Sequence, residues 1–261
     1  MEKAKYLTNG KNKNITLIVC KDYETLSMKA AQIIAAQVNS KPDCVLGLAT
    51  GSSPVGLYAE LIEMCKQGRV DFSRVKSYNL DEYYPLSPDN DQSYRYFMDH
   101  NLFYGINIKK ENTHVPSGTA ADIDAECAAY DKAVAEAGGI DLQLLGIGGN
   151  GHIGFNEPTD TFIIPTHKVT LKEDTIKANS RFFASIDDVP TQAVTMGIGT
   201  IFNARSVLLV ANGKGKAAAI KAMLEGNVDP QVPASILKLH SKVYVVIDED
   251  AASELTEYTE A

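Results

Sequence analysis

The segment Cys44-Val-Leu-Gly-Leu-Ala-Thr-Gly-Ser-Ser-Pro54 predicts a buried strand that turns directly into a helix. Its first residues are an apolar run, typical of a strand in a sheet that is covered on both faces. The polar turn Thr50-Gly51-Ser52-Ser53 follows, and Ser53 and Pro54 suit the N-cap and the first position of a helix. We therefore expect one strand, turn and helix of a parallel sheet here.

The same alternation continues along the chain. Further strand candidates are the apolar runs Ile15–Cys20, Val75–Leu80, Leu142–Ile147, Ala193–Ile198, Val207–Ala211 and Val243–Ile247. Helices are expected where apolar residues recur three and four positions apart, in Tyr23–Val38, Pro54–Gln67, Gln92–Phe103, Asp122–Ala137 and Lys214–Glu225. This alternation predicts an α/β fold, a parallel sheet with helices on both faces.

Residues 1–261 are expected to form a single domain, because no repeat, low-complexity stretch or Pro/Gly/Ser linker interrupts the pattern. A polar stretch that contains two prolines begins at Pro158 and shows little periodicity. Structureless segments of this length are more often functional loops than plain connectors. We therefore expect a flap, or lid segment, at about residues 158–185.

The composition is that of an ordinary soluble globule, with 44% hydrophobic and 22% charged residues. The formal net charge of −8 would repel a phosphate backbone, so no nucleic-acid partner is expected. No apolar run is long enough for a membrane helix, and residues 1–14 lack the apolar core of a targeting peptide. Cys20, Cys44, Cys65 and Cys127 occur singly, as buried thiols do in a reducing compartment, which favours a cytoplasmic protein.

Ligands of an open parallel sheet bind beyond the carboxyl ends of its strands, where four polar loops are expected. The turn of residues 50–53 offers backbone N–H groups, hydroxyls and a helix N-terminus to a phosphate. An ordinary strand–helix turn is the alternative, and the turn is not a P-loop because no Lys-Ser or Lys-Thr follows the glycine.

The second loop, Asn79-Leu-Asp-Glu-Tyr83, places two carboxylates side by side at the end of a strand. In a cleft, the pKa values of Asp81 and Glu82 would be pushed apart, which would leave one of them suited to proton abstraction. The alternative is a solvated turn whose acids cap a helix.

The third loop is Gly146-Ile-Gly-Gly-Asn-Gly-His-Ile-Gly-Phe-Asn-Glu-Pro158. It contains the spacing G-x-G-x-x-G, but Pro158 arrives too early for the helix of a dinucleotide site, so we treat that match as accidental and expect no cofactor. Glycines leave His152 little to pack on, which favours a catalytic role beside Glu157 over a structural one. A metal site is the rival, but no H-E-x-x-H or similar ligand spacing is present and no metal is expected.

The fourth group of loop residues is basic, in Ala178-Asn-Ser-Arg181 and in Asn212-Gly-Lys-Gly-Lys216. An Arg fork and a Lys ammonium suit an anionic substrate, although solvated surface charge is the alternative. Together the four loops indicate proton-transfer chemistry on a small phosphorylated molecule.

Four strings resemble the glucosamine-6-phosphate deaminase family: Leu46-Gly-Leu-Ala-Thr-Gly-Ser-Ser-Pro54, Tyr78-Asn-Leu-Asp-Glu-Tyr83, Gly148-Gly-Asn-Gly-His-Ile-Gly-Phe-Asn-Glu-Pro158 and Ala178-Asn-Ser-Arg-Phe-Phe183. The similarity extends from about residue 15 to 247. It implies a modified Rossmann-like fold and an aldose–ketose isomerisation with deamination, which converts glucosamine 6-phosphate to fructose 6-phosphate and ammonia in amino-sugar catabolism. We class the expected enzyme as a hydrolase or isomerase.

The resemblance also implies roles for individual residues. Asp81 matches the general base that moves a proton between C2 and C1 through an enolamine. His152 matches the residue that opens the pyranose ring at its oxygen, and Glu157 the carboxylate that orients it. Substrate-binding positions are expected at Thr50, Gly51, Ser52, Ser53, Glu82, Arg181 and Lys216.

Two departures from the family pattern matter. Many members have Asp where this chain has Asn150, and an amide hydrogen-bonds without sharing a proton, so we keep Asn150 among the catalytic residues with an altered proton relay. Members activated by N-acetylglucosamine 6-phosphate carry basic residues where this chain has His167 and Val169. We therefore expect no activator requirement. Monomer and homo-oligomer both stay open.

Three other functions are weighed against the deaminase. A 6-phosphogluconolactonase resembles this fold but lacks the carboxylate pair Asp81-Glu82. A sugar-phosphate sensor of a transcription regulator needs a DNA-binding module, and a first strand at Ile15 is expected to leave no room for one. An inactive paralogue that only binds sugar phosphates is disfavoured because Asp81, His152 and Glu157 are retained.

Overall fold

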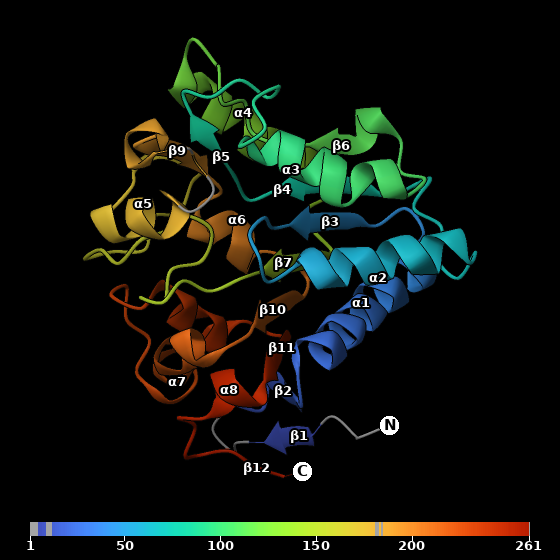
Figure 1. Cartoon of the computed structure of the whole chain (residues 1–261), viewed down its shortest axis with the longest axis vertical. Coiled ribbons are helices and arrows are strands. Elements are labelled where there is room, and N and C mark those ends of the chain that lie inside the picture. Colours follow the sequence, from blue (N-terminus) through green and yellow to red (C-terminus); the bar gives the residue numbers. More distant parts are fainter. Residues whose placement is uncertain (1–4, 9–11, 181–182, 184, 261) are drawn as a thin grey trace.

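The computed structural model describes residues 5–8, 12–180, 183 and 185–260 (Figure 1). Within these residues a nine-stranded sheet runs in the order β12-β1-β2-β11-β10-β7-β3-β4-β6. Its strands are β1 (Lys5–Thr8), β2 (Ile15–Cys20), β3 (Val45–Leu48), β4 (Lys76–Asn79), β6 (Thr113–His114), β7 (Leu142–Leu145), β10 (Val207–Ala211), β11 (Val243–Asp248) and β12 (Thr259–Glu260). From β2 to β6 every pair is parallel, and β1 and β12 add antiparallel pairs at one edge.

Consecutive residues of β3, β7 and β10 are all buried, so this sheet is covered on both faces. The helices are α1 (Tyr23–Ser40), α2 (Val55–Lys66), α3 (Tyr94–Asn101), α4 (Ile123–Glu136), α5 (Glu173–Asn179), α6 (Ile198–Phe202), α7 (Ala217–Glu225) and α8 (Glu249–Ala252). Short 3₁₀ turns are η1 (Phe103–Gly105), η2 (Lys110–Asn112), η4 (Ile186–Asp188), η5 (Lys214–Lys216) and η6 (Pro233–Leu239). The predicted α/β fold with a mostly parallel sheet is confirmed.

Helix starts follow local capping chemistry. The side chains of Asp22, Ser93 and Asp122 each accept a hydrogen bond from the backbone N–H three residues later, at 2.8, 3.0 and 3.0 Å. The helices predicted from periodicity therefore begin within two residues of their expected positions in these three cases. The helix predicted at Lys214–Glu225 begins later than expected, because Lys214–Lys216 form the turn η5 and α7 begins only at Ala217.

A second, antiparallel sheet has the order β5-β9-β8, formed by β5 (Asp81–Tyr84), β9 (Gln192–Thr195) and β8 (His167–Thr170). The prediction that residues 193–198 add a strand to the parallel sheet is therefore wrong. An apolar run alone does not specify which sheet a strand joins, and here its partners are β5 and β8. The pairing sets Asp81 opposite Thr195.

The segment 158–185 contains more regular structure than its composition suggested, because β8 and α5 lie within it. A second core underlies this flap; it consists of Tyr83, Phe155, Leu171 and Ala193, with Tyr94, Val169, Ile176 and Phe183 packed against it. This cluster is separate from the main core around the parallel sheet. The flap therefore rests on packing of its own.

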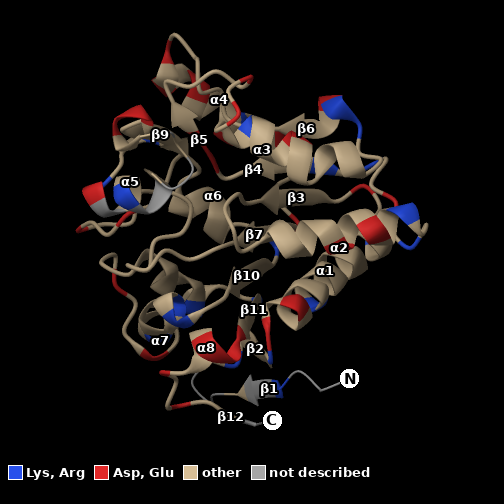
Figure 2. Ribbon diagram, viewed as in Figure 1, with Lys and Arg blue, Asp and Glu red and all other residues tan. Residues whose placement is uncertain are grey.

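Basic and acidic residues are scattered over the molecule in Figure 2, and no continuous basic stripe is visible in that view. In the described part of the chain, no helix combines the length and the apolar character needed to cross a bilayer. All four cysteines are free thiols, and three are buried as expected, whereas Cys65 is half-buried.

Candidate active site

A cleft of about 1020 Å³ lies where the loops after β3, β4, β7 and β10 meet the flap. Eight of the predicted site residues line it: Thr50, Gly51, Ser52, Ser53, Asp81, Asn150, His152 and Lys216. Two predicted residues, Glu82 and Glu157, lie beside the lining, and Arg181 lies outside the described residues. Loops that are distant in sequence thus converge at the carboxyl ends of the strands, as the sheet topology requires.

The turn of residues 50–53 is held from outside the loop. The hydroxyl of Tyr23 donates to the carbonyls of Ser52 and Ser53, both at 3.0 Å, and accepts from the N–H of Gly56 at 2.8 Å. Gly51 has a φ of +100°, a conformation that favours glycine. A helix of 12 residues begins after Pro54, and its first residue Val55 lines the cleft, so the positive end of the helix lies there.

The prediction that Ser53 caps this helix is wrong. Pro54 occupies the N-cap position, and the hydroxyl of Ser53 instead donates to Oδ1 of Asn212 at 2.9 Å. This contact joins the turn to the loop after β10, which carries Lys216 into the cleft. The two segments that sequence reasoning assigned to phosphate therefore touch.

Asp248 fixes the loop of Lys216. Its carboxylate accepts two hydrogen bonds from the N–H of Gly213, at 3.0 and 2.9 Å, and one from the N–H of Ala251 at 2.8 Å. Sequence reasoning missed Asp248, because an acid that follows a strand is ordinarily a helix cap, and it serves as one here as well.

Asp81 begins β5, two residues after β4 ends, and its side chain is buried against the cleft. Burial, and secondarily the negative charge of Glu82, raise the pKa of Asp81 to about 8. The described residues offer its carboxylate no hydrogen-bond donor. Asp81 is therefore a carboxylate of unusual basicity that faces open volume.

Glu82 lies on the opposite side of β5 and is also buried. Its carboxylate accepts from the N–H groups of Tyr83, Tyr94 and Arg95 at 2.9, 2.8 and 2.9 Å, which ties β5 to the start of α3. Burial raises the pKa of Glu82 to about 7, against the opposing effect of these donors. Glu82 therefore supports the wall of the cleft by holding β5 against α3.

The glycine loop, residues 146–158, brings three predicted catalytic side chains together. The amide of Asn150 donates to Oε2 of Glu157 at 2.7 Å, and its Oδ1 accepts from the N–H of His152 at 3.2 Å. Nδ1 of His152 faces Oε1 of Glu157 at 3.5 Å, longer than an ordinary hydrogen bond. A side chain at Gly148 would collide with the His152 ring, 2.3 Å from a Cβ there, so glycine gives the ring its room.

Glu157 is buried and remains ionised. Burial alone would raise its pKa, but the charge and polar contact of His152, the hydroxyl of Thr175 and the amide of Asn150 together lower it to about 2. Thr175 belongs to α5 and lines the cleft, and no motif pointed to it. His152 therefore has a permanent negative charge beside Nδ1.

The glycine loop also packs against the strand of Asp81. The N–H of Phe155 donates to Oγ1 of Thr195, the residue opposite Asp81, at 3.0 Å. A Cβ on Gly154 would lie 2.9 Å from that Oγ1 and 3.4 Å from Oδ2 of Asp81. The close approach of this glycine places the histidine loop and the basic carboxylate in one cleft.

Among the residues that the structure describes, no three His, Cys, Asp or Glu side chains form a group that could hold a metal ion. The cleft is lined both by the side chains of Asp81 and His152 and by the turn of residues 50–53 with Lys216. Such an arrangement suits proton transfer on a small phosphorylated molecule.

Residues 22–246 match the family described as glucosamine-6-phosphate isomerases and 6-phosphogluconolactonases. The chain belongs to this family. A glucosamine-6-phosphate deaminase of Thermoanaerobacter sp. (strain X514) is 55% identical over 237 residues, which cover 91% of this chain and 94% of that relative. A glucosamine-6-phosphate deaminase of Clostridium perfringens (strain 13 / Type A) is 54% identical over 239 residues, 92% of this chain and 99% of the relative.

Among solved structures, a monomeric glucosamine-6-phosphate deaminase has a TM-score of 0.90 to this chain. It is 48% identical, and the match covers 92% of this chain and 99% of that one. The resemblance drawn from the four sequence strings is confirmed, and the family fold extends over nearly the whole chain.

Burial of the Asp81 carboxylate should make the free energy of unfolding depend on pH. Its pKa is about 8 in the folded protein against an ordinary 3.8, so between these pH values the folded protein holds a proton that the unfolded chain has lost. The free energy of unfolding therefore falls as pH rises through this window. Asp81→Asn removes that loss, and we expect it to stabilise the protein by about 2 kcal/mol at pH 8.5, roughly 4–8 °C in melting temperature, and by less at pH 6.

Asp141→Asn is the matched control for thermal melting. Asp141 is equally buried but accepts hydrogen bonds from Lys41, Arg205 and the N–H of Val45. Neutralising a paired carboxylate leaves its partners unsatisfied, so this variant should melt lower at both pH values. A loss of stability in Asp81→Asn, or a gain that does not grow with pH, would contradict the assignment.

Proposed function

We propose that this chain converts glucosamine 6-phosphate and water to fructose 6-phosphate and ammonia. The observation that carries the proposal is Asp81, a buried carboxylate of raised pKa that faces the same cleft as His152 and the anion-binding turn. The names of the close relatives support the substrate. The reaction type is isomerisation with deamination, and the hydrolase class considered from the sequence does not describe it.

The phosphate end of the cleft positions the substrate. The N–H groups of residues 50–53, the hydroxyls of Thr50 and Ser52 and the ammonium of Lys216 bind the dianion, and the helix dipole of α2 adds to the attraction. Family resemblance adds Arg181 to this set. A fixed phosphate orients C1 and C2 toward the acid–base end, which supplies much of the catalytic advantage.

Chemistry then proceeds in three proton-transfer stages. His152, held by Glu157, moves a proton from the O1 hydroxyl to the ring oxygen, which opens the pyranose to the aldehyde. Asp81 removes the proton from C2 while the C2 ammonium of the substrate passes one of its own protons to O1, which gives an enolamine. Asp81 then returns its proton to C1, which leaves a protonated imine at C2. Water adds to that imine and ammonia departs, so the sum of atoms balances. A base of pKa about 8 is strong enough for the second stage and is regenerated by it.

The other functions weighed from the sequence are less well supported. The family description includes 6-phosphogluconolactonases, but ester hydrolysis needs no base for a carbon-bound proton. An inactive binding protein would derive no benefit from a buried carboxylate that lowers its free energy of unfolding as pH rises from 3.8 to about 8.

We also propose that the flap, residues 158–185, covers the bound substrate, and that the chain acts as a cytoplasmic monomer. The free thiols Cys20, Cys44 and Cys127 suit a reducing compartment. The monomeric state follows the solved deaminase structure of that description.

The first test is the release of ammonia and fructose 6-phosphate from glucosamine 6-phosphate, with chelator present and no acetylated sugar phosphate added. We expect stoichiometric release by the wild type, with a rate that rises with pH as Asp81 ionises near pH 8. Asp81→Asn should abolish both ammonia release and hydrogen–deuterium exchange at C2. Exchange that persists in this variant would identify a different base.

Replacing Asn150 tests the proton relay of the glycine loop. Nδ2 of Asn150 lies 2.7 Å from Oε2 of Glu157, so Asn150→Asp would set two carboxylates against each other. Such a pair holds one proton at neutral pH. We expect measurable turnover with a displaced pH–rate profile, and an unchanged profile would remove Asn150 from the ring-opening network.

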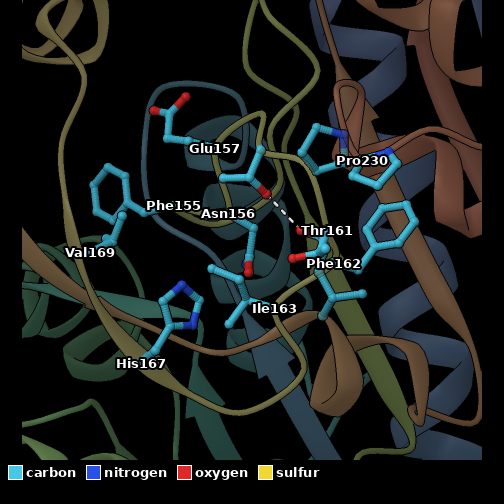
Figure 3. Close-up of a pocket in the computed structure, with 12 residues that line it drawn as sticks. Phe155, Asn156, Glu157, Thr161, Phe162, Ile163, His167, Val169 and Pro230 are labelled. Carbon is cyan, nitrogen blue, oxygen red and sulfur yellow. Dashed lines mark hydrogen bonds between the residues drawn. The ribbon is translucent and has the colours of Figure 1, made fainter.

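The surroundings of His167 and Val169 in the flap lead us to expect no activator site there. Nδ1 of His167 lies 2.9 Å from the carbonyl oxygen of Pro165, and the side chain of Val169 packs on the second core. Both residues line a cavity of only about 40 Å³ beside Glu157 (Figure 3), and none of the described residues that line it is Lys or Arg. Sites for small ligands are roughly 300 Å³ or larger. We expect hyperbolic kinetics; sigmoidal rates relieved by N-acetylglucosamine 6-phosphate would contradict this.

A further inference from the structure

The carboxylate of Glu157 is held at both ends by different parts of the chain. Oε2 accepts from Asn150, which belongs to the same glycine loop. Oε1 accepts from the hydroxyl of Thr175, which belongs to the flap helix α5, 18 residues further along the chain. A carboxylate offers two oxygens, so the contacts at both of them fix its rotation.

The oxygen that Thr175 contacts is also the one that faces the imidazole. Oε1 of Glu157 lies 3.5 Å from Nδ1 of His152, and that nitrogen has no hydrogen-bond partner among the described residues. The position of Oε1 therefore decides how strongly Glu157 holds the ring. Without the hydroxyl, the carboxylate would be attached only through Oε2 and could turn away from His152.

Thr175 owes its position to packing of the flap. It is buried, although its neighbours Glu173 and Lys177 on α5 are exposed. The helix is anchored by Leu171 and Ile176 in the second core, and by Phe183, whose ring meets that of Tyr83 edge-on with centroids 5.7 Å apart. The packing of α5 therefore places the hydroxyl of Thr175 on Oε1 of Glu157.

We infer that Thr175 is a positioning residue for the His152–Glu157 pair and couples the packing of the flap to ring opening. The inference rests on the proposed function and deepens it. The hydroxyl sets Oε1 opposite Nδ1 only while α5 lies on the second core, so the ring-opening pair is competent only under a packed flap. The hydroxyl of Thr175 donates to Glu157, and the assigned role acts through that carboxylate.

The test compares Thr175→Val, which keeps the shape and removes the hydroxyl, with Thr175→Ser, which keeps the hydroxyl. We expect Thr175→Val to lower kcat for glucosamine 6-phosphate about tenfold, the value of one hydrogen bond to a charged group, with KM changed less than about twofold. Thr175→Ser should recover activity to within about threefold of wild type. Glu173→Gln, an exposed change on the same helix, should leave both constants unaltered.

A double-mutant cycle locates the effect at Glu157. Once Glu157→Gln has removed the charged acceptor, adding Thr175→Val should cost no further activity beyond about twofold. Independent, multiplying losses would overturn the inference, as would an unchanged kcat in Thr175→Val or equal impairment of the Ser and Val variants. A rise in KM at constant kcat would mean that Thr175 affects only substrate binding under the flap, and this result would also overturn the inference.

A spectroscopic readout separates this inference from the proposed function. The ring ¹⁵N resonances of His152, assigned with His152→Gln, should move in Thr175→Val and stay in place in Glu173→Gln, in the absence of any substrate. Melting curves verify that the variants are folded. If Thr175→Val is not folded, Thr175→Ala takes its place. A wild type without deaminase activity would reject the function, whereas an unmoved His152 resonance would reject the role of Thr175.

Discussion

The carboxylate of Asp81 is held out of water where the chain leaves the parallel sheet and enters the antiparallel one, and the charge that acts on it is the like charge of Glu82. A cation beside it would stabilise the ionised form and make it a weak base. Among the residues that the structure describes, no cation takes that position, and the buried carboxylate lowers the free energy of unfolding as pH rises from 3.8 to about 8. The supporting structure around the cleft therefore has to be stable without help from this residue.

That support comes largely from Glu82. The two adjacent acids lie on opposite sides of β5 because side chains alternate along a strand, so one faces the cleft and the other faces α3. Glu82 meets three backbone N–H groups and joins two elements, whereas Asp81 meets none that the described residues provide. The same functional group is therefore a strong base at Asp81 and a structural hydrogen-bond acceptor at Glu82. The side of the strand on which each carboxylate lies determines its role.

The strand–turn–helix units were predictable because their signals are local: apolar runs, spacing, and capping residues such as Asp22 and Asp122. The strand β5 was not, since Asp81-Glu82 looks like a solvated turn until the N–H groups of Tyr94 and Arg95 are brought to it. Contacts between loops that are distant in sequence could not be predicted for the same reason. Thr175 carries no motif, and its contact with Glu157 depends on a second core whose members are scattered through the sequence.

The two ends of the cleft differ in how they are built. The proposed anion-binding end is fixed by Tyr23 and Asp248, which belong to α1 and β11 of the main sheet assembly, so its shape does not depend on the flap. The His152–Glu157 pair at the other end is held jointly by the glycine loop and the flap, which rests on a smaller core. Binding energy from the phosphate is available to stabilise the packed flap, and a non-reacting group of the substrate would thereby promote chemistry several bonds away. A dephosphorylated amino sugar would forgo that energy, so the loss would appear in turnover as well as in affinity.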